Sequence, residues 1–412
     1  MTIARKFPRL GLLVFAAALV SANAVVADRA FADTFAVTTT SDSGVGSLRQ
    51  ALSDAATNPG DDTVEIQAGL GTITVTSELS WSGSGAVTID GNGATVAGPG
   101  VVRGFVDDGG TGLTIDQLTV TGFGGPISGD AAPVVSEGGP ITLERCSITG
   151  NTLGSVGDVG GGVLSQGGPV TITGCEISGN RAETSGGVAG GGVVSNGGSI
   201  MITDSAISGN SAETSADDAG GGVLSEGGPV TITDSEISGN RAGTSGGVAG
   251  GGVLARGASL NVVSSTITAN NASSSAGDAS GGVASEGASV DVVSSTITAN
   301  SASSSAGDAS GGALSEVGSA TVSNSTVDCN AASSSGGDAA GGILSAGGGI
   351  TVNGSTLVGN TAISVFTAES SLLAKGGPID GSDNTISDDT TSCAPAPTPV
   401  VPPVIVPARF TG

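Results

Sequence analysis

The chain lacks the residues on which most enzyme sites depend. Its 412 residues include no histidine, no tyrosine and one tryptophan. Without histidine there is no Ser-His or Cys-His pair to activate a nucleophile, and no imidazole to bind a metal. No aromatic residue occurs between Phe123 and Phe366, so a sugar ring has nothing to stack on along that stretch. These absences disfavour catalysis.

Positive charge is also scarce. The sequence has 12 Lys and Arg residues against 37 Asp and Glu, which gives a net charge of −25. Lysine is absent between Lys6 and Lys375. No basic patch is present, so nucleic acid is not expected as a partner. Polyanions such as pectate would be repelled unless cations intervene.

The sequence instead has glycine and a fixed repeat. Its 74 glycines form no collagen triplet, and its mean hydropathy of +0.26 argues against disorder. One residue in every 30 is an asparagine over seven successive units, and glycine follows the same period. These positions are Asn180, Asn210, Asn240, Asn270, Asn300, Asn330 and Asn360, with Gly161, Gly191, Gly221, Gly251, Gly281, Gly311 and Gly341. Such a period is typical of one supersecondary unit stacked on its own copies.

The unit from 161 to 190 predicts three short strands separated by turns, at residues 161–165, 170–173 and 176–178. Stacked copies would form an all-β, right-handed parallel β-helix, a pectin-lyase-like solenoid of about ten coils. The asparagines are expected to stack at an inward turn. Residues 181–190 are interpreted as a polar loop. Alternation predicts one outward apolar column, which is either exposed as a partner site or covered by the 181–190 loops. Its members are Leu164, Val194, Leu224, Leu254, Ala284, Leu314 and Leu344.

The two ends of the chain differ from the repeats. Residues 1–32 predict a signal peptide, with cleavage after Ala24 or Ala32, and no later segment predicts a transmembrane helix. Residues 33–160 are assigned to an N-terminal cap and irregular coils. Ser47 begins a short helix there, which would cover the open solenoid end. Residues 161–393 hold the regular repeats and a closing coil, and 394–412 form a Pro-rich tail.

Several motifs resemble known families. Phe35–Thr40, Gly46–Ala51 and Gly71–Thr74 are similar to the N-terminal module of bacterial secreted β-helix proteins of the CSLREA type. The GGGVLS segments and tetrads such as Ile177–Asn180 resemble polymorphic outer membrane protein repeats, although Ile, Val or Leu replaces the usual Phe. The resemblance covers roughly residues 34–393. It implies a surface-exposed or secreted protein, in some relatives an adhesin, and it supplies no catalytic residue.

Four cysteines in an exported chain permit disulfides. Cys146 and Cys175 lie 29 residues apart in matching contexts, so they should sit one coil apart and within disulfide range. We therefore expect a Cys146–Cys175 bridge, with two buried free thiols as the alternative. Whether Cys329 and Cys393 also pair is left open by the sequence.

Acidic positions offer two alternatives to a purely structural role. Asp204 and Asp234, with Glu176, Glu236, Arg181 and Arg241 in register, are the candidates for a polysaccharide lyase or hydrolase that acts on acidic polysaccharide. The column Asp278, Asp308 and Asp338, preceded by Asp218, is the candidate for calcium binding. The segments Thr266–Thr268 and Thr296–Thr298 suggest ice binding as a further alternative.

The sequence favours an exported, monomeric protein at the cell surface or outside the cell, associated with an outer membrane or cell wall if it is retained. Its expected role is structural or adhesive, without catalytic, cofactor or metal residues. Its expected partner is an extracellular protein or polysaccharide surface. The sequence identifies neither the ligand nor the anchor.

Overall fold

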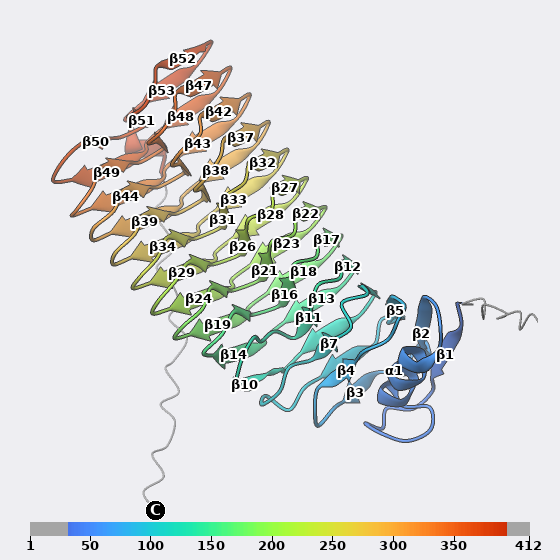
Figure 1. Ribbon diagram of the computed structural model, residues 1–412. Helices are drawn as coiled ribbons and strands as arrows, with labels where there is room; N and C mark the ends of the chain where they lie inside the picture. The colour runs from blue at the N-terminus through green and yellow to red at the C-terminus, as the bar shows by residue number, and fades with distance from the viewer. Residues whose placement is uncertain (1–31, 394–412) are drawn as a thin grey trace, which may run out of the picture.

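The computed structural model describes residues 32–393 and is a right-handed parallel β-helix (Figure 1). The sequence segments predicted as the signal peptide (1–32) and the Pro-rich tail (394–412) lie outside the described residues, apart from Ala32. The largest sheets contain 13 and 12 strands, one strand from each coil, so the solenoid has about twelve coils. The fold class predicted from the 30-residue period is confirmed, with roughly two coils more than expected.

Each regular coil contains five strands. In the coil that begins at Val163 these are β16 (Val163–Gln166), β17 (Val170–Thr173), β18 (Glu176–Ser178), β19 (Arg181–Thr184) and β20 (Ala189–Gly190). They belong to sheets of 11, 13, 12, 9 and 8 strands, respectively. β17 pairs in parallel with β22 (Ile200–Thr203), and Val170 lies opposite Ile200, so the 30-residue period is the register. Each residue therefore faces its own copy in the next coil.

The segment from Arg181 to Gly190 is not the predicted loop. It forms β19 and β20, the two strands of this coil that were not among the three expected. Together with their copies these strands make a side lobe on the main barrel. Its interior is a ladder of alanines that includes Ala182 and Ala189, both fully buried. The side chains are too small to give a clear hydrophobic period, which explains the wrong prediction.

The N-terminal end carries the expected cap. Helix α1 (Leu48–Thr57) begins after Ser47, whose hydroxyl accepts a hydrogen bond from the Gln50 amide at 3.2 Å. The helix buries Leu48, Ala51, Leu52 and Ala55. It contacts β1 (Thr34–Val37), β2 (Asp62–Ile66) and β4 (Leu79–Trp81). The cap therefore joins the main apolar core at the end where that core would otherwise be open.

The leucine column (Leu164, Val194, Leu224, Leu254, Ala284, Leu314 and Leu344) does point out of the main barrel, but it is fully buried. The side lobe covers it. A Cβ added to Gly250 would lie 2.8 Å from the Cβ of Leu254, so glycine at this position lets the lobe's backbone approach. The column thus points outward as predicted, and of the two outcomes that the sequence left open the covered one holds, because the segment interpreted as a loop packs over it.

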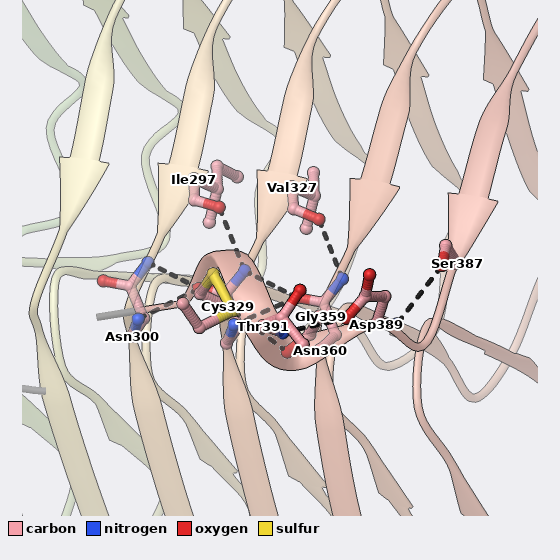
Figure 2. Close-up of a disulfide and its surroundings, with 11 residues drawn as sticks. Ile297, Asn300, Val327, Cys329, Gly359, Asn360, Ser387, Asp389 and Thr391 are labelled. Atoms are coloured by element: carbon pink, nitrogen blue, oxygen red, sulfur yellow. Dashed lines mark hydrogen bonds between the residues drawn. A yellow bond between two sulfur atoms is a disulfide. The ribbon is translucent and has the colours of Figure 1, made fainter. Parts of the chain in front are cut away.

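The asparagine ladder has the predicted inward position. The Asn210 side-chain oxygen accepts hydrogen bonds from the Asn180 backbone amide at 3.0 Å and from Asn180 Nδ2 at 3.1 Å. Asn180 Nδ2 also donates to the Ile148 carbonyl at 2.8 Å. Figure 2 shows later rungs of the same ladder, with Ile297 and Val327 providing the carbonyls. The asparagines are structural, since every polar atom of the amide has a partner within the stack.

The predicted Cys146–Cys175 bridge is absent, and both cysteines are buried free thiols. They occupy the first positions of a ladder that continues as serines. The Cys146 amide donates to Cys175 Sγ at 3.2 Å, and the Cys175 amide donates to Ser205 Oγ at 3.0 Å. Stacked side chains in one ladder point the same way, so the two sulfur atoms lie side by side instead of facing each other.

The disulfide in the described part of the chain joins Cys329 and Cys393, with 5.5 Å between their Cα atoms. Cys329 lies in the turn after β43 (Thr326–Asp328), and Cys393 follows the short 3₁₀ helix η1 (Thr390–Ser392) (Figure 2). The bridge therefore fixes the end of the last coil to an earlier one. Sequence alone could not pair these residues because they occupy no common repeat position.

Peptide mapping tests the cysteine assignment. Alkylation of the unfolded, unreduced protein should modify Cys146 and Cys175, whereas Cys329 and Cys393 should react only after reduction. A chain-entropy estimate for the loop closed by 64 residues gives the bridge about 4 kcal/mol of stabilisation, so Cys329→Ser should also lower the melting temperature. A Cys146–Cys175 peptide in the unreduced sample would contradict the structure.

Truncation of the leucine column tests the side-lobe packing. Leu254→Ala should lower the free energy of unfolding by about 2–5 kcal/mol, because it leaves a cavity under the lobe. Met201→Ala is the matched control, since Met201 is 52% exposed on the 13-stranded sheet and should change stability by less than about 0.5 kcal/mol. Urea denaturation followed by circular dichroism gives both values, and equal small effects would contradict the packing.

Candidate functional site

An open groove of about 770 Å³ follows the turns that join the 13-stranded sheet to the 12-stranded sheet. Four successive turns contribute its main polar residues. They connect β12 (Ile141–Glu144) to β13 (Ser147–Thr149), β17 to β18, β22 to β23 (Ala206–Ser208), and β27 (Val230–Thr233) to β28 (Glu236–Ser238). We call this feature the carboxylate groove, after Glu176, Asp204, Asp234 and Glu236, which line it.

The turn geometry explains the residue types at the groove. Asp204 and Asp234 have φ values of 50° and 49°, in the left-handed region. Asp tolerates this conformation better than most residues, and the equivalent position in the coil between Arg145 and Asp204 is Gly174. The two aspartates are therefore partly explained by the bend that the chain must make between two sheets. Their carboxylates remain exposed to solvent.

The structure brings together four of the six residues that the sequence singled out. Asp204, Asp234, Glu176 and Glu236 line one groove, but Arg181 and Arg241 do not. Both arginines lie on the 9-stranded sheet, where Arg181 pairs with Glu183 and Arg241 with Glu213. The groove's arginine is Arg145, which pairs with Asp116 and is half exposed. Sequence reasoning missed it, although it occupies the repeat position of Asp204 and Asp234.

The groove is suited to binding more clearly than to catalysis. Its four carboxylates are exposed. Asp204 and Asp234 are one coil apart, about 4.8 Å, whereas Glu176 and Glu236 are separated by the coil of Ala206, so together they present a negative surface to solvent. Hydroxyl groups of Ser147 and Thr266 and the buried thiol of Cys175 complete its lining, and no aromatic ring is among the lining residues. Such an array attracts cationic groups and repels polyanions.

No helix in residues 32–393 is long and apolar enough to cross a membrane.

The two threonine segments proposed for ice binding form β33 (Thr266–Thr268) and β38 (Thr296–Thr298), which lie side by side in register. The pattern ends at β43, where Asp328 follows Thr298 in the column. In the other direction Ser238 precedes Thr268. The uniform threonine face therefore spans two coils, as the sequence indicated.

A second polar feature follows the outer edge of the joint between barrel and side lobe. One side is the column of residues that lie two positions after each member of the leucine column. The other side is the column of residues that directly precede the strands of the 8-stranded sheet. We call it the acid seam. It contains Asp218, Glu226, Arg256, Asp278, Glu286, Asp308, Glu316, Asp338 and Lys375. Val188 and Val248 occupy the same column as Asp218 and pack against the leucine column, so the seam lies next to that apolar layer.

The aspartates predicted to bind calcium have structural contacts in this seam. Asp278 Oδ1 accepts the Asp308 amide at 2.7 Å, and Asp308 Oδ1 accepts the Asp338 amide at 2.9 Å. Asp218 likewise accepts the Val248 amide at 2.8 Å. Within residues 32–393, no three carboxylate or thiol side chains form a ready-made metal cage. The glutamates that face these aspartates were not part of the sequence prediction.

Burial and mutual repulsion change the acidity of the seam. Burial, together with the charge of Asp218, raises the pKa of both Glu226 and Glu286 to about 7. Burial and a hydrogen bond with Asp278 also raise the pKa of Glu316. Burial raises the pKa of Asp218, although the Val248 amide acts in the opposite direction. Near neutral pH the folded seam therefore still holds protons that the unfolded chain has already released at lower pH.

Comparisons with known proteins concern the fold. Residues 77–307 match the family model described as a right-handed beta helix region. No curated protein sequence matches the chain. Among solved structures, the Dettilon tailspike protein gp208 is 13% identical, with a TM-score of 0.33, and the match covers 83% of this chain and 66% of that chain. The A-module of the mannuronan C-5 epimerase AlgE6 from Azotobacter vinelandii is also 13% identical, with a TM-score of 0.35 and coverages of 86% and 97%. Neither likeness transfers a residue, ligand or activity.

The acid seam should make stability depend on pH. A carboxyl group with a raised pKa stabilises the fold below the unfolded pKa of about 4.3, and this contribution is lost as pH rises through about 7. The melting temperature should therefore fall between about pH 5 and pH 8. Glu286→Gln with Glu316→Gln should remove much of that fall. The exposed pair Glu176→Gln and Glu236→Gln is the control, and an equal effect in both variants would contradict the assignment.

Proposed function

Because the chain belongs to the right-handed β-helix family, we propose that it is an exported binding protein that acts at the cell surface or outside the cell and carries out no catalysis. The solenoid is a rigid scaffold, since the coils are held together by backbone hydrogen bonds and, from Asn151 to Asn360, also by the asparagine ladder. Its ligand contacts the carboxylate groove. This is the structural or adhesive role expected from the sequence.

The observation that carries the proposal is the chemical uniformity of the groove. Glu176, Asp204, Asp234 and Glu236 are exposed carboxylates at repeated positions, and the lining includes no Lys. The chain has no His or Tyr at all. A glycosidase requires two carboxyl groups with different environments, one as an acid and one as a base or nucleophile. Asp204 and Asp234 are equivalent to each other, as are Glu176 and Glu236 two coils apart, and all four are exposed, so they do not supply that difference.

The charge of the groove narrows the ligand. Four carboxylates against one arginine favour a surface that is neutral or carries amines, such as an amino-sugar polymer or a basic protein face. Acidic polysaccharides would be repelled unless a cation bridged the two. The partner predicted from the sequence, an extracellular protein or polysaccharide surface, is kept and restricted by this chemistry.

The alternative is a lyase or hydrolase that acts on acidic polysaccharide. The specific observation in its favour is that Asp204 and Asp234 lie one coil apart in the same groove as Arg145. Incubation with pectin and alginate in the presence of calcium, followed by assays for reducing ends and unsaturated products, decides between the two functions. Product formation that is lost in Asp204→Asn would replace the binding proposal by the enzymatic one.

The location can be tested separately. The proposed export depends on residues 1–32, whose sequence predicts a signal peptide. Blotting of the secreted, envelope and cytoplasmic fractions of the producing cells should find the chain outside the cytoplasm and shortened after Ala24 or Ala32. A full-length chain confined to the cytoplasm would contradict the proposal.

Groove variants test the binding role. Asp204→Asn with Asp234→Asn should weaken binding to chitosan oligosaccharides by about tenfold or more, because two ligand-facing charges are lost. Glu183→Gln with Glu213→Gln is the control, since it removes two exposed carboxylates from the 9-stranded sheet. Binding should also weaken as salt is raised. If both double variants bind chitosan as the unaltered protein does, the carboxylate groove is not the binding surface.

A further inference from the structure

The carboxylates of the acid seam have different kinds of side-chain partner in different coils. At its N-terminal side the opposing residues are amides: Gln166 Nε2 donates to Asp130 Oδ2, and Asn196 Nδ2 donates to Asp158 Oδ2, each at 2.7 Å. In the middle Arg256 pairs with Asp218 and, through Nε at 2.8 Å, with Glu286. In these coils each seam aspartate meets a neutral or positive partner.

The C-terminal side uses a lysine. Lys375 Nζ lies between two stacked aspartates, in contact with Asp308 and 2.7 Å from Asp338 Oδ2. The ammonium group therefore shows that a cation fits between neighbouring members of the aspartate column. It also lies near the outer edge of the seam, with 31% of the lysine side chain exposed.

The sequence between Arg256 and Lys375 contains no Lys or Arg. Glu316 is hydrogen-bonded to Asp278 and lies near Glu286, and of these three carboxylates Arg256 is paired only with Glu286, through Oε2. Glu286 Oε1 is buried and accepts no hydrogen bond, in a side chain that is only 7% exposed. A buried carboxylate oxygen without a donor is costly. At low pH a proton offsets this cost; once the proton is lost, a cation from outside the chain can offset it instead.

We propose that a hard divalent cation, with calcium as the best match, binds between Asp278, Glu286 and Glu316 and performs there the role that Lys375 performs between Asp308 and Asp338. Carboxylate oxygens are the ligands that such ions prefer. Because these carboxylates do not form a ready-made cage, the ion bridges neighbouring coils and keeps part of its water shell. Protons compete for the same oxygens.

The site also connects to the packing of the molecule. Glu286 and Glu316 each lie two residues after a member of the leucine column, Ala284 and Leu314, directly beyond the ends of β36 (Val283–Ser285) and β41 (Ala313–Ser315). Asp278 precedes β35 (Ala279–Ser280) of the side lobe. An ion between them therefore ties the lobe to the barrel directly beside the apolar layer. This inference does not depend on the ligand proposed for the carboxylate groove.

The experiment is a thermal melt of the full chain with calcium chloride, compared with sodium chloride at the same ionic strength. At about pH 8, calcium at about 10 mM should raise the melting temperature by about 2 °C or more. At about pH 5 the rise should be much smaller, because protons occupy the carboxylates. Glu286→Gln with Glu316→Gln should abolish the rise, whereas Asp204→Asn with Asp234→Asn should retain it.

A second variant keeps the test decisive if the double glutamine variant folds poorly. Glu316→Lys places an ammonium beside Asp278 and Glu286, so it should raise the melting temperature without calcium and remove the response to calcium. The proposal is overturned if calcium has no effect on the unaltered protein at about pH 8, or if sodium chloride has the same effect. It is also overturned if either seam variant keeps the full calcium response.

Discussion

The rest of the structure depends on the stacking of each residue on its own copy, one coil away. Backbone hydrogen bonds run along the solenoid axis, and the register Val170 to Ile200 is repeated from coil to coil. At a spacing of about 4.8 Å, each side chain lies beside the side chain at the same repeat position in the next coil, which often has the same chemical group. Aliphatic side chains gain from this arrangement by packing, and asparagines gain by completing each other's hydrogen bonds. The aliphatic columns and the asparagine ladder therefore both stabilise the fold through contacts between stacked copies of the same residue.

Carboxylates respond to the same constraint in the opposite way. Identical charges one coil apart repel, so an acidic column must be exposed, paired or protonated. The carboxylate groove meets this condition by exposure: Asp204 and Asp234 are in water. The acid seam meets it by partners, which change from amides to Arg256 and then to Lys375. The two acidic features of this protein thus differ in burial, and burial decides that the groove can receive a ligand while the seam affects stability.

Much of the fold follows from the sequence, because a correct prediction for one repeat position is correct for the same position in every regular coil. The strands at 170–173 and 176–178, the asparagine ladder and the Ser47-capped helix were all predicted and are confirmed. The side lobe was not, because Ala182, Ala189 and Gly190 are too small to show a strand-like apolar pattern. Without the lobe, the sequence could only leave open whether the leucine column is exposed or covered. The Cys146 and Cys175 positions were also right, but their side chains serve the serine ladder and form no bridge.

The sequence by itself determined the coil, its register and the residue that each column would contain, because these depend on a period that can be counted along the chain. It also placed Glu176, Asp204, Asp234 and Glu236 in one neighbourhood. Only the tertiary structure decided which columns face each other across the joint between barrel and lobe. That is why Arg145 in the groove, Glu286 and Glu316 in the seam, and the Cys329–Cys393 bridge emerged only there. Contacts between different columns depend on how the coil closes on itself, and the repeat period carries no information about that closure.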